Sequence, residues 1–223
     1  MKKTLYIDIE TIPGPESGKD AIEVKPPAQM KKQETIDKWY AEKGDDAKEE
    51  AYRKQSFNGG YGQVCAFSFA VDDGEVTGHY IQSDRGDEAG LISGVFELID
   101  VSLDGHNNPY ACGHFVSGFD LRFLMHRCIV LGIRLPLWLS ATANAAAWDD
   151  KVRDTMFLWA GARDTIGLDE LCTILGIEGK GDVDGSMVYD MWLAGEYEKI
   201  GKYCDSDVSK VREINRKFVA AGL

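Results

Sequence analysis

The sequence has little cysteine and no long apolar run, and both shortages exclude whole classes of protein. Its five cysteines are odd in number, lie far apart and form no CxxC pair, which argues against a disulfide framework and a zinc cluster. We expect them to be reduced core residues. The start MKKT has the charge of a signal peptide, but Asp8 interrupts the apolar residues too early. We therefore expect a soluble, cytoplasmic protein that neither spans nor binds a membrane.

Basic residues are in the minority as well. The 223 residues include 25 Lys and Arg against 37 Asp and Glu, a net charge of −12. This balance disfavours broad, non-specific binding to nucleic acid. It does not exclude an enzyme that meets phosphates through divalent cations, because a bound cation reverses the local charge. A hydrophobic content of 44% is ordinary for a globular protein, and we predict one domain spanning 1–223.

The order of predicted elements indicates an α/β fold with a mixed sheet flanked by helices. The alternating run 3–10 predicts a strand, and 61–71 with 75–82 predicts a hairpin around an Asp-Gly turn. Further strands are predicted at 109–115 and within WDDKVRDTMFLW. Helices are predicted at 88–99, 119–131, 168–175, 186–194 and 196–219.

The segment 16–58 differs from the rest of the chain in composition. It is highly charged and predicts helices at 34–43 and 46–55. We interpret it as a helical insertion after the first strand, outside the core sheet. Its lysines could clamp a nucleic-acid strand, but its many acids favour a solvated cover in which Trp39 and Tyr40 pack inward.

Two acids of the first strand raise the question of a metal site. Asp8 and Glu10 are two residues apart and therefore project from the same face of a strand. Side by side, two ionised carboxylates repel unless a cation lies between them. An edge strand with a wet face would also explain them, and D-x-E alone is weak evidence.

Other candidate residues lie much later in the chain. Asp120 begins a helix, where the helix dipole favours an acid in any case. Tyr203 and Asp207 are four residues apart and share one face of the last helix, although a packed Tyr and a solvated Asp would show the same spacing. Asp205 should point away from the Tyr203 face, which leaves Asp207 as the candidate.

The stretches DIETIP, GFDLRFL and YCDSDV occur in an order that resembles the DEDD superfamily of 3′–5′ exonucleases. They look most like the proofreading domain of B-family DNA polymerases, as it occurs in stand-alone proteins. The resemblance covers 3–12 and 61–218. The superfamily's histidine branch would place His at Lys202, whereas Tyr203 stands where the tyrosine branch requires it.

This resemblance implies an RNase H-like fold and a catalytic mechanism with two divalent cations, Mg²⁺ or Mn²⁺. Asp8, Glu10, Asp120 and Asp207 would bind the cations, with Asp8 bridging them, and Tyr203 would orient the attacking water. The expected reaction removes nucleoside 5′-monophosphates from the 3′ end of single-stranded DNA, alone or for a polymerase or repair complex. The alternatives are a 3′–5′ exoribonuclease and an inactive RNase H-like module that binds nucleic acid or a polymerase.

The resemblance also suggests where substrate would be held: Thr11, Ile12, Phe119 and Lys180. Lys180 lies in the stretch GKGD. It would either contact a phosphate or belong to an ordinary flexible turn. One residue departs from the pattern, because Phe115 stands where many relatives carry Asn. An Asn contact to substrate or to the second strand would then be missing or supplied by another residue.

Three further residues near Asp120 allow two interpretations each. Arg122 and Arg127 would contact the substrate backbone or, with more support, solvate their helix. His114 would touch substrate or, as we expect, be a core histidine with satisfied hydrogen bonds.

Overall fold

A mixed β-sheet forms the centre of the computed structural model, which describes residues 2–83, 86–179 and 183–223. Within these ranges the sheet has five strands in the order β3-β2-β1-β4-β5. They are β1 (Thr4–Ile12), β2 (Gln63–Val71), β3 (Thr77–Tyr80), β4 (Tyr110–Gly113) and β5 (Val152–Asp154). The β1–β2 and β2–β3 pairs are antiparallel, whereas β1–β4 and β4–β5 are parallel. This arrangement confirms the predicted mixed sheet.

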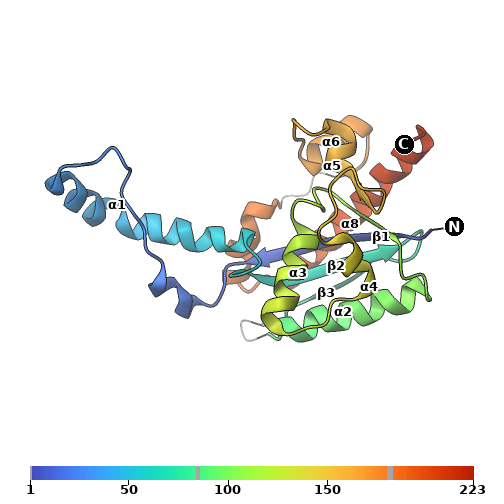
Figure 1. The fold of residues 1–223 in the computed structure, drawn as a ribbon, viewed down its shortest axis with the longest axis horizontal. Coiled ribbons are helices and arrows are strands. Elements are labelled where there is room, and N and C mark those ends of the chain that lie inside the picture. Colours follow the sequence, from blue (N-terminus) through green and yellow to red (C-terminus); the bar gives the residue numbers. More distant parts are fainter. Residues whose placement is uncertain (1, 84–85, 180–182) are drawn as a thin grey trace.

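Helices cover both faces of the sheet (Figure 1). On one face lie α2 (Glu88–Leu103), α3 (Asp120–Leu131) and α4 (Leu137–Thr142), and on the other lie α7 (Val188–Leu193) and α8 (Tyr197–Ala220). The remaining elements are α1 (Gln33–Arg53), α5 (Thr155–Ala160), α6 (Leu168–Leu175) and the 3-10 helices η1 (Glu16–Ala21), η2 (Lys54–Phe57) and η3 (Gly185–Met187). Within the described ranges, no helix is long and apolar enough to cross a membrane.

The alternation of β1 decides which of its side chains reach the site. Leu5, Ile7 and Ile9 join the apolar core beneath α2, α3 and α4. Tyr6 and Ile12 join the apolar clusters beneath α7 and α8. Since successive side chains of a strand point to opposite faces, Asp8 and Glu10 also face α8.

The insertion after β1 departs from the prediction in two ways. α1 is one continuous helix rather than two, and it extends away from the sheet (Figure 1). Tyr40 is 46% exposed, lies edge-on to Trp39 and donates a hydrogen bond to the Val24 carbonyl. The expected cover with Tyr40 packed inward is therefore wrong: this part of the insertion packs on itself.

The C-terminal end of α1 anchors this helix to the body of the protein. Tyr52 is buried, and its hydroxyl donates a 2.7 Å hydrogen bond to the Gly14 carbonyl just after β1. A helix with so many charged residues has too little apolar surface to lie flat on the sheet, so its charged length remains in solvent.

Candidate metal centre

The site lies where β1 continues past the end of its neighbour β4. The pairing with β4 stops at Tyr6, and three residues further along β1 the Ile9 N–H donates a 3.1 Å hydrogen bond to Asp120 Oδ1. In the pairing with β2 a register shift follows between Glu10 and Thr11. Such irregularities commonly re-aim side chains next to functional sites. The end of β1 is thus held between α3 and α8.

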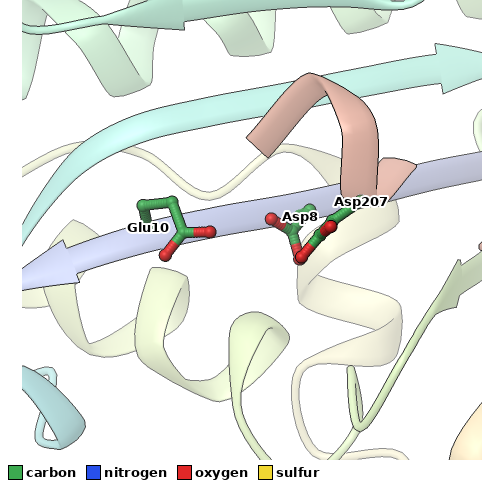
Figure 2. Close-up of side chains that lie close together, drawn as sticks. All are labelled: Asp8, Glu10 and Asp207. Atoms are coloured by element: carbon green, nitrogen blue, oxygen red, sulfur yellow. The ribbon is translucent and has the colours of Figure 1, made fainter. Parts of the chain in front are cut away.

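Three carboxylates meet at this place. Asp8, Glu10 and Asp207 each offer an oxygen, and these oxygens lie within 4.8 Å of one another. Figure 2 shows Asp8 and Glu10 projecting from β1 while Asp207 reaches toward them from α8. Asp120 is not part of this trio, and it lies beside β1 through its bond to the Ile9 N–H.

Burial and mutual repulsion make the four acids reluctant to ionise. The pKa of Asp8 is raised well above its usual value by burial and by the charges of Glu10, Asp120 and Asp207. The pKa of Glu10 is raised first by burial and then by the charges of Asp207 and Asp120. Burial raises the pKa of Asp120 to about 7, and burial also raises that of Asp207. Without a counter-charge this cluster destabilises the fold.

These residues fit a divalent cation. Asp8 Oδ2 is buried and has no hydrogen-bond donor within the described part of the chain. A cation placed among the oxygens would occupy this free acceptor and offset the repulsion. The donors are all carboxylate oxygens, which are the ligands preferred by hard cations such as Mg²⁺ and Mn²⁺.

Lys210 is a member of the site that the sequence analysis missed. Its Nζ lies 2.9 Å from Asp207 Oδ1 and 3.0 Å from Asp169 Oδ1, and the residue is only 6% exposed. Burial lowers the pKa of Lys210, but its bonds to Asp207 and Asp169 outweigh this and raise the pKa overall. The signal was the three-residue spacing from Asp207, which places both on one helix face.

Tyr203 lies one helical turn before Asp207 and is half-buried against the cluster beneath α7 and α8. Burial and then the charges of Asp207, Glu10 and Asp8 raise its pKa, so its hydroxyl keeps its proton. Asp205, the competing acid on α8, accepts a 2.7 Å hydrogen bond from the Ser68 hydroxyl on β2. It is therefore turned away from the trio.

A second overlooked residue, Asp154, shapes the loop that leads to Asp120. It is buried and accepts hydrogen bonds from the Phe115 N–H at 3.0 Å, the Ser117 N–H at 3.1 Å and the Ser117 hydroxyl at 2.7 Å. It also caps the N-terminus of α5, and this capping position was its only sequence signal.

Phe115 adopts a backbone conformation that bulky residues rarely use. Its φ is +62°, in the left-handed region, and the side chain is 47% exposed. Its ring lies over Gly118, where an added Cβ would be only 2.3 Å from a ring carbon. The hydrogen bonds to Asp154 therefore fix this loop even though Phe115 stands where the resemblance expects Asn.

The other residues predicted to bind substrate differ in their surroundings. Thr11 donates a 2.7 Å hydrogen bond to the Ser56 carbonyl, and Phe119 is half-buried at the start of α3. Ile12 is buried beneath α7 and α8, so only its backbone remains for a substrate. Lys180 lies outside the described residues.

The expectations for His114, Arg127 and Arg122 have different outcomes. His114 is a satisfied core histidine, as predicted: its ring nitrogens lie 3.0 Å from Thr155 Oγ1 and 2.8 Å from the Ile166 carbonyl, and burial lowers its pKa. Arg127 contradicts both interpretations, because it is buried and forms two hydrogen bonds to Glu88, at 2.8 and 2.7 Å. Arg122 is exposed, as a solvated residue would be.

Comparisons with known proteins agree with this architecture. The structure is similar to the family B DNA polymerase from the hyperthermophilic archaeon Pyrobaculum calidifontis, with a TM-score of 0.59 and 15% identity over 98% of this chain. The chain spans only 25% of that polymerase's length, and at this identity the likeness shows the fold alone, an RNase H-like fold. No curated protein matches the chain.

A protein-family comparison provides the assignment. The family described as "Predicted 3'-5' exonuclease related to the exonuclease domain of PolB" matches residues 57–211. This span contains Asp120, Tyr203 and Asp207, whereas Asp8 and Glu10 reach the same site from β1, ahead of the match. The chain belongs to this family of predicted 3′–5′ exonucleases related to the exonuclease domain of PolB.

Proposed function

We propose that the protein is a metal-dependent exonuclease that shortens single-stranded DNA from its 3′ end and releases nucleoside 5′-monophosphates. The observation that carries this proposal is the convergence of Asp8, Glu10 and Asp207 around a buried carboxylate oxygen that has no donor among the described residues. Such a cluster would destabilise a protein that only binds nucleic acid, because the pKa of each of its three acids is raised. A cation-dependent reaction explains why the cluster exists.

Two divalent cations, Mg²⁺ or Mn²⁺, would be held by the four acids. Asp8 would be a ligand together with Glu10 and Asp207, since its buried Oδ2 has no donor among the described residues. Asp120, which lies beside β1, would supply the fourth carboxylate. When bound, the cations activate the attacking water and stabilise the leaving 3′ oxygen.

The protein's own groups would orient the reactants. The protonated Tyr203 hydroxyl would position the attacking water by hydrogen bonding, since its raised pKa makes it a poor base. Lys210 would hold one oxygen of Asp207 and thereby fix the rotation of that carboxylate. Fixed ligands of this kind reduce the rearrangement needed to reach the transition state.

The test is a gel assay with 5′-labelled single-stranded DNA and the RNA of the same sequence, with Mg²⁺, Mn²⁺ or EDTA. We expect a metal-dependent ladder that shortens DNA from its 3′ end, and the RNA lane reports the sugar preference. Asp207→Ala should slow cleavage by more than ~100-fold, beyond what changes around a metal ligand usually cost. Asp205→Ala, on the same helix but turned toward Ser68, is the matched control and should retain activity. Strand binding without degradation under any condition would overturn the proposal and favour the inactive module.

A further inference from the structure

A shallow hollow beside the metal centre is lined by aromatic and basic side chains. Its volume is about 240 Å³, and it lies between the end of the insertion and α3. Its lining includes Phe57, Gly59, Phe119, Arg122, Phe123 and His126. Phe119 directly precedes Asp120 in the chain, and Ser56, next to Phe57, accepts a hydrogen bond from Thr11, next to Glu10. The hollow therefore begins one residue from the carboxylates along two segments of the chain.

Phe57, the last residue of η2, forms the outer wall of the hollow. It is 72% exposed, and its ring centroid lies 6.5 Å from that of Phe119. The rings of Phe119 and Phe123 follow at 5.3 Å, so aromatic rings continue from the solvent toward α3. An exposed phenylalanine in such a row presents a flat apolar surface for another ring.

The backbone that carries Phe57 is fixed to the rest of the protein. The carbonyl of the preceding residue, Ser56, accepts a 2.7 Å hydrogen bond from Thr11 at the end of β1. On the other side of Phe57, the chain lies so close to α3 that a Cβ added to Gly59 would be 2.8 Å from the Phe123 carbonyl oxygen. Phe57 is therefore held in place at the hollow.

The charge of the hollow indicates what it would accept. Arg122 is exposed and His126 half-exposed at its wall, and none of its lining residues is acidic, although the whole chain has a net charge of −12. A purely apolar ligand would form no ion pair or hydrogen bond with Arg122. Flat rings next to a guanidinium are the combination that binds single-stranded nucleic acid, in which bases stack and phosphates pair with basic groups.

We propose that this hollow binds an unpaired nucleotide of the substrate strand, with its base stacked on Phe57 and its phosphate paired with Arg122. The inference rests on the proposed function, since the strand must reach the adjacent carboxylates. It gives the end of the insertion a direct part in substrate binding, which its aromatic residue performs rather than its lysines.

Binding in EDTA tests the proposal separately from cleavage. The probes are a fluorescein-labelled ten-nucleotide oligo(dT) and an abasic strand of the same length, followed by fluorescence anisotropy. Stacking on one aromatic side chain predicts that Phe57→Ala weakens oligo(dT) binding about 5- to 150-fold. The same change should leave the abasic strand unaffected, because that strand has charge but no base.

Matched variants separate stacking from other effects. Phe57→Trp should bind oligo(dT) at least as well as the parent protein, whereas Phe57→Leu should resemble Phe57→Ala because it is apolar but lacks a flat ring. Arg122→Gln should weaken both strands and reduce the salt dependence by about one phosphate contact. Leu137→Ala, an exposed apolar residue on α4, is the control.

Three results would overturn the proposal. They are oligo(dT) binding by Phe57→Ala within twofold of the parent protein, an equal loss on both strands, or Phe57→Leu binding as well as Phe57→Trp. The proposed function fails in a different measurement, the metal-dependent ladder, so the two failures are distinguishable.

Discussion

Replacing Asp120 by asparagine is expected to stabilise the metal-free protein at pH 8 and to stabilise it by less than half as much at pH 5. Burial raises the pKa of Asp120 from 3.8 to about 7, and the charges of Asp154 and Asp207 contribute to this rise. Above pH 7 the folded protein must therefore ionise a buried carboxyl group, whereas the unfolded chain ionises it at no cost. As the pH falls from the folded toward the unfolded value, the folded state gains the proton and this penalty disappears.

The magnitude follows from the size of the pKa shift. A rise from 3.8 to about 7 is roughly three units, and at 1.36 kcal/mol per unit the upper bound is ~4 kcal/mol. Local relaxation reduces such a penalty, so we expect ~2 kcal/mol. This corresponds to a rise in Tm of ~4–8 °C for a chain of this size. The asparagine keeps an oxygen that can accept the Ile9 N–H bond, so the substitution removes charge and little else.

The assay is thermal unfolding by circular dichroism in EDTA at pH 5 and pH 8, repeated with Mn²⁺. The parent protein should gain Tm with Mn²⁺ at pH 8, because a ligand that binds only the folded state stabilises it. Asp120→Asn should gain less, because it has lost one carboxylate ligand, so Mn²⁺ should reduce its advantage in Tm over the parent protein. If Asp120→Asn is no more stable than the parent protein in EDTA at pH 8, the reasoning about the buried charge is refuted.

Three further predictions concern single side chains. Tyr203→Phe should slow cleavage ~10- to 100-fold with unchanged Mn²⁺ affinity by calorimetry, and an unaltered rate would show that Tyr203 only packs. Lys210→Met should weaken Mn²⁺ binding ~10- to 100-fold because Asp207 loses the partner that orients it, and equal affinity would contradict that role. Arg127→Met should lower the free energy of unfolding by ~3–5 kcal/mol, since it leaves Glu88 buried and unpaired. Urea unfolding measures this loss, a loss below ~1 kcal/mol would argue against it, and adding Glu88→Gln should recover most of it.

Local patterns were enough to predict the features that depend on periodicity. The two-residue period of β1 correctly placed Asp8 and Glu10 on one face, and the helical period of α8 distinguished Asp207 from Asp205. Each of these inferences needs only the geometry of one element. The order of elements likewise indicated a mixed sheet between helices, because parallel neighbours require crossovers and antiparallel ones do not.

Pairings between elements could not be predicted in the same way. Arg127 and Glu88 lie on different helices, and nothing near either residue identifies its partner. Asp154 has its role because β5 ends beside the loop that contains Phe115 and Ser117. These contacts are consequences of the assembled sheet, which a reading of single elements does not contain.

The helix α1 shows a limit of local reasoning itself. The prediction of two helices, 34–43 and 46–55, places a break at Gly44, but the helix runs through this residue. A glycine within a helix costs only ~1 kcal/mol. The Ala, Glu, Lys and Asp residues around it extend the helix despite that cost, so one glycine was too weak a signal for a break.

Because the site combines residues of β1 and α8, it can form only after both elements have been synthesised. Among the described elements these are the first strand and the last helix, so Asp8 and Glu10 leave the ribosome long before Asp207. The core beneath α2, α3 and α4 involves the opposite face of the sheet and does not require α8. Closing so long a loop is slow and has a high entropic cost. A nascent or truncated chain without α8 therefore lacks the carboxylate trio, because Asp207 is then missing.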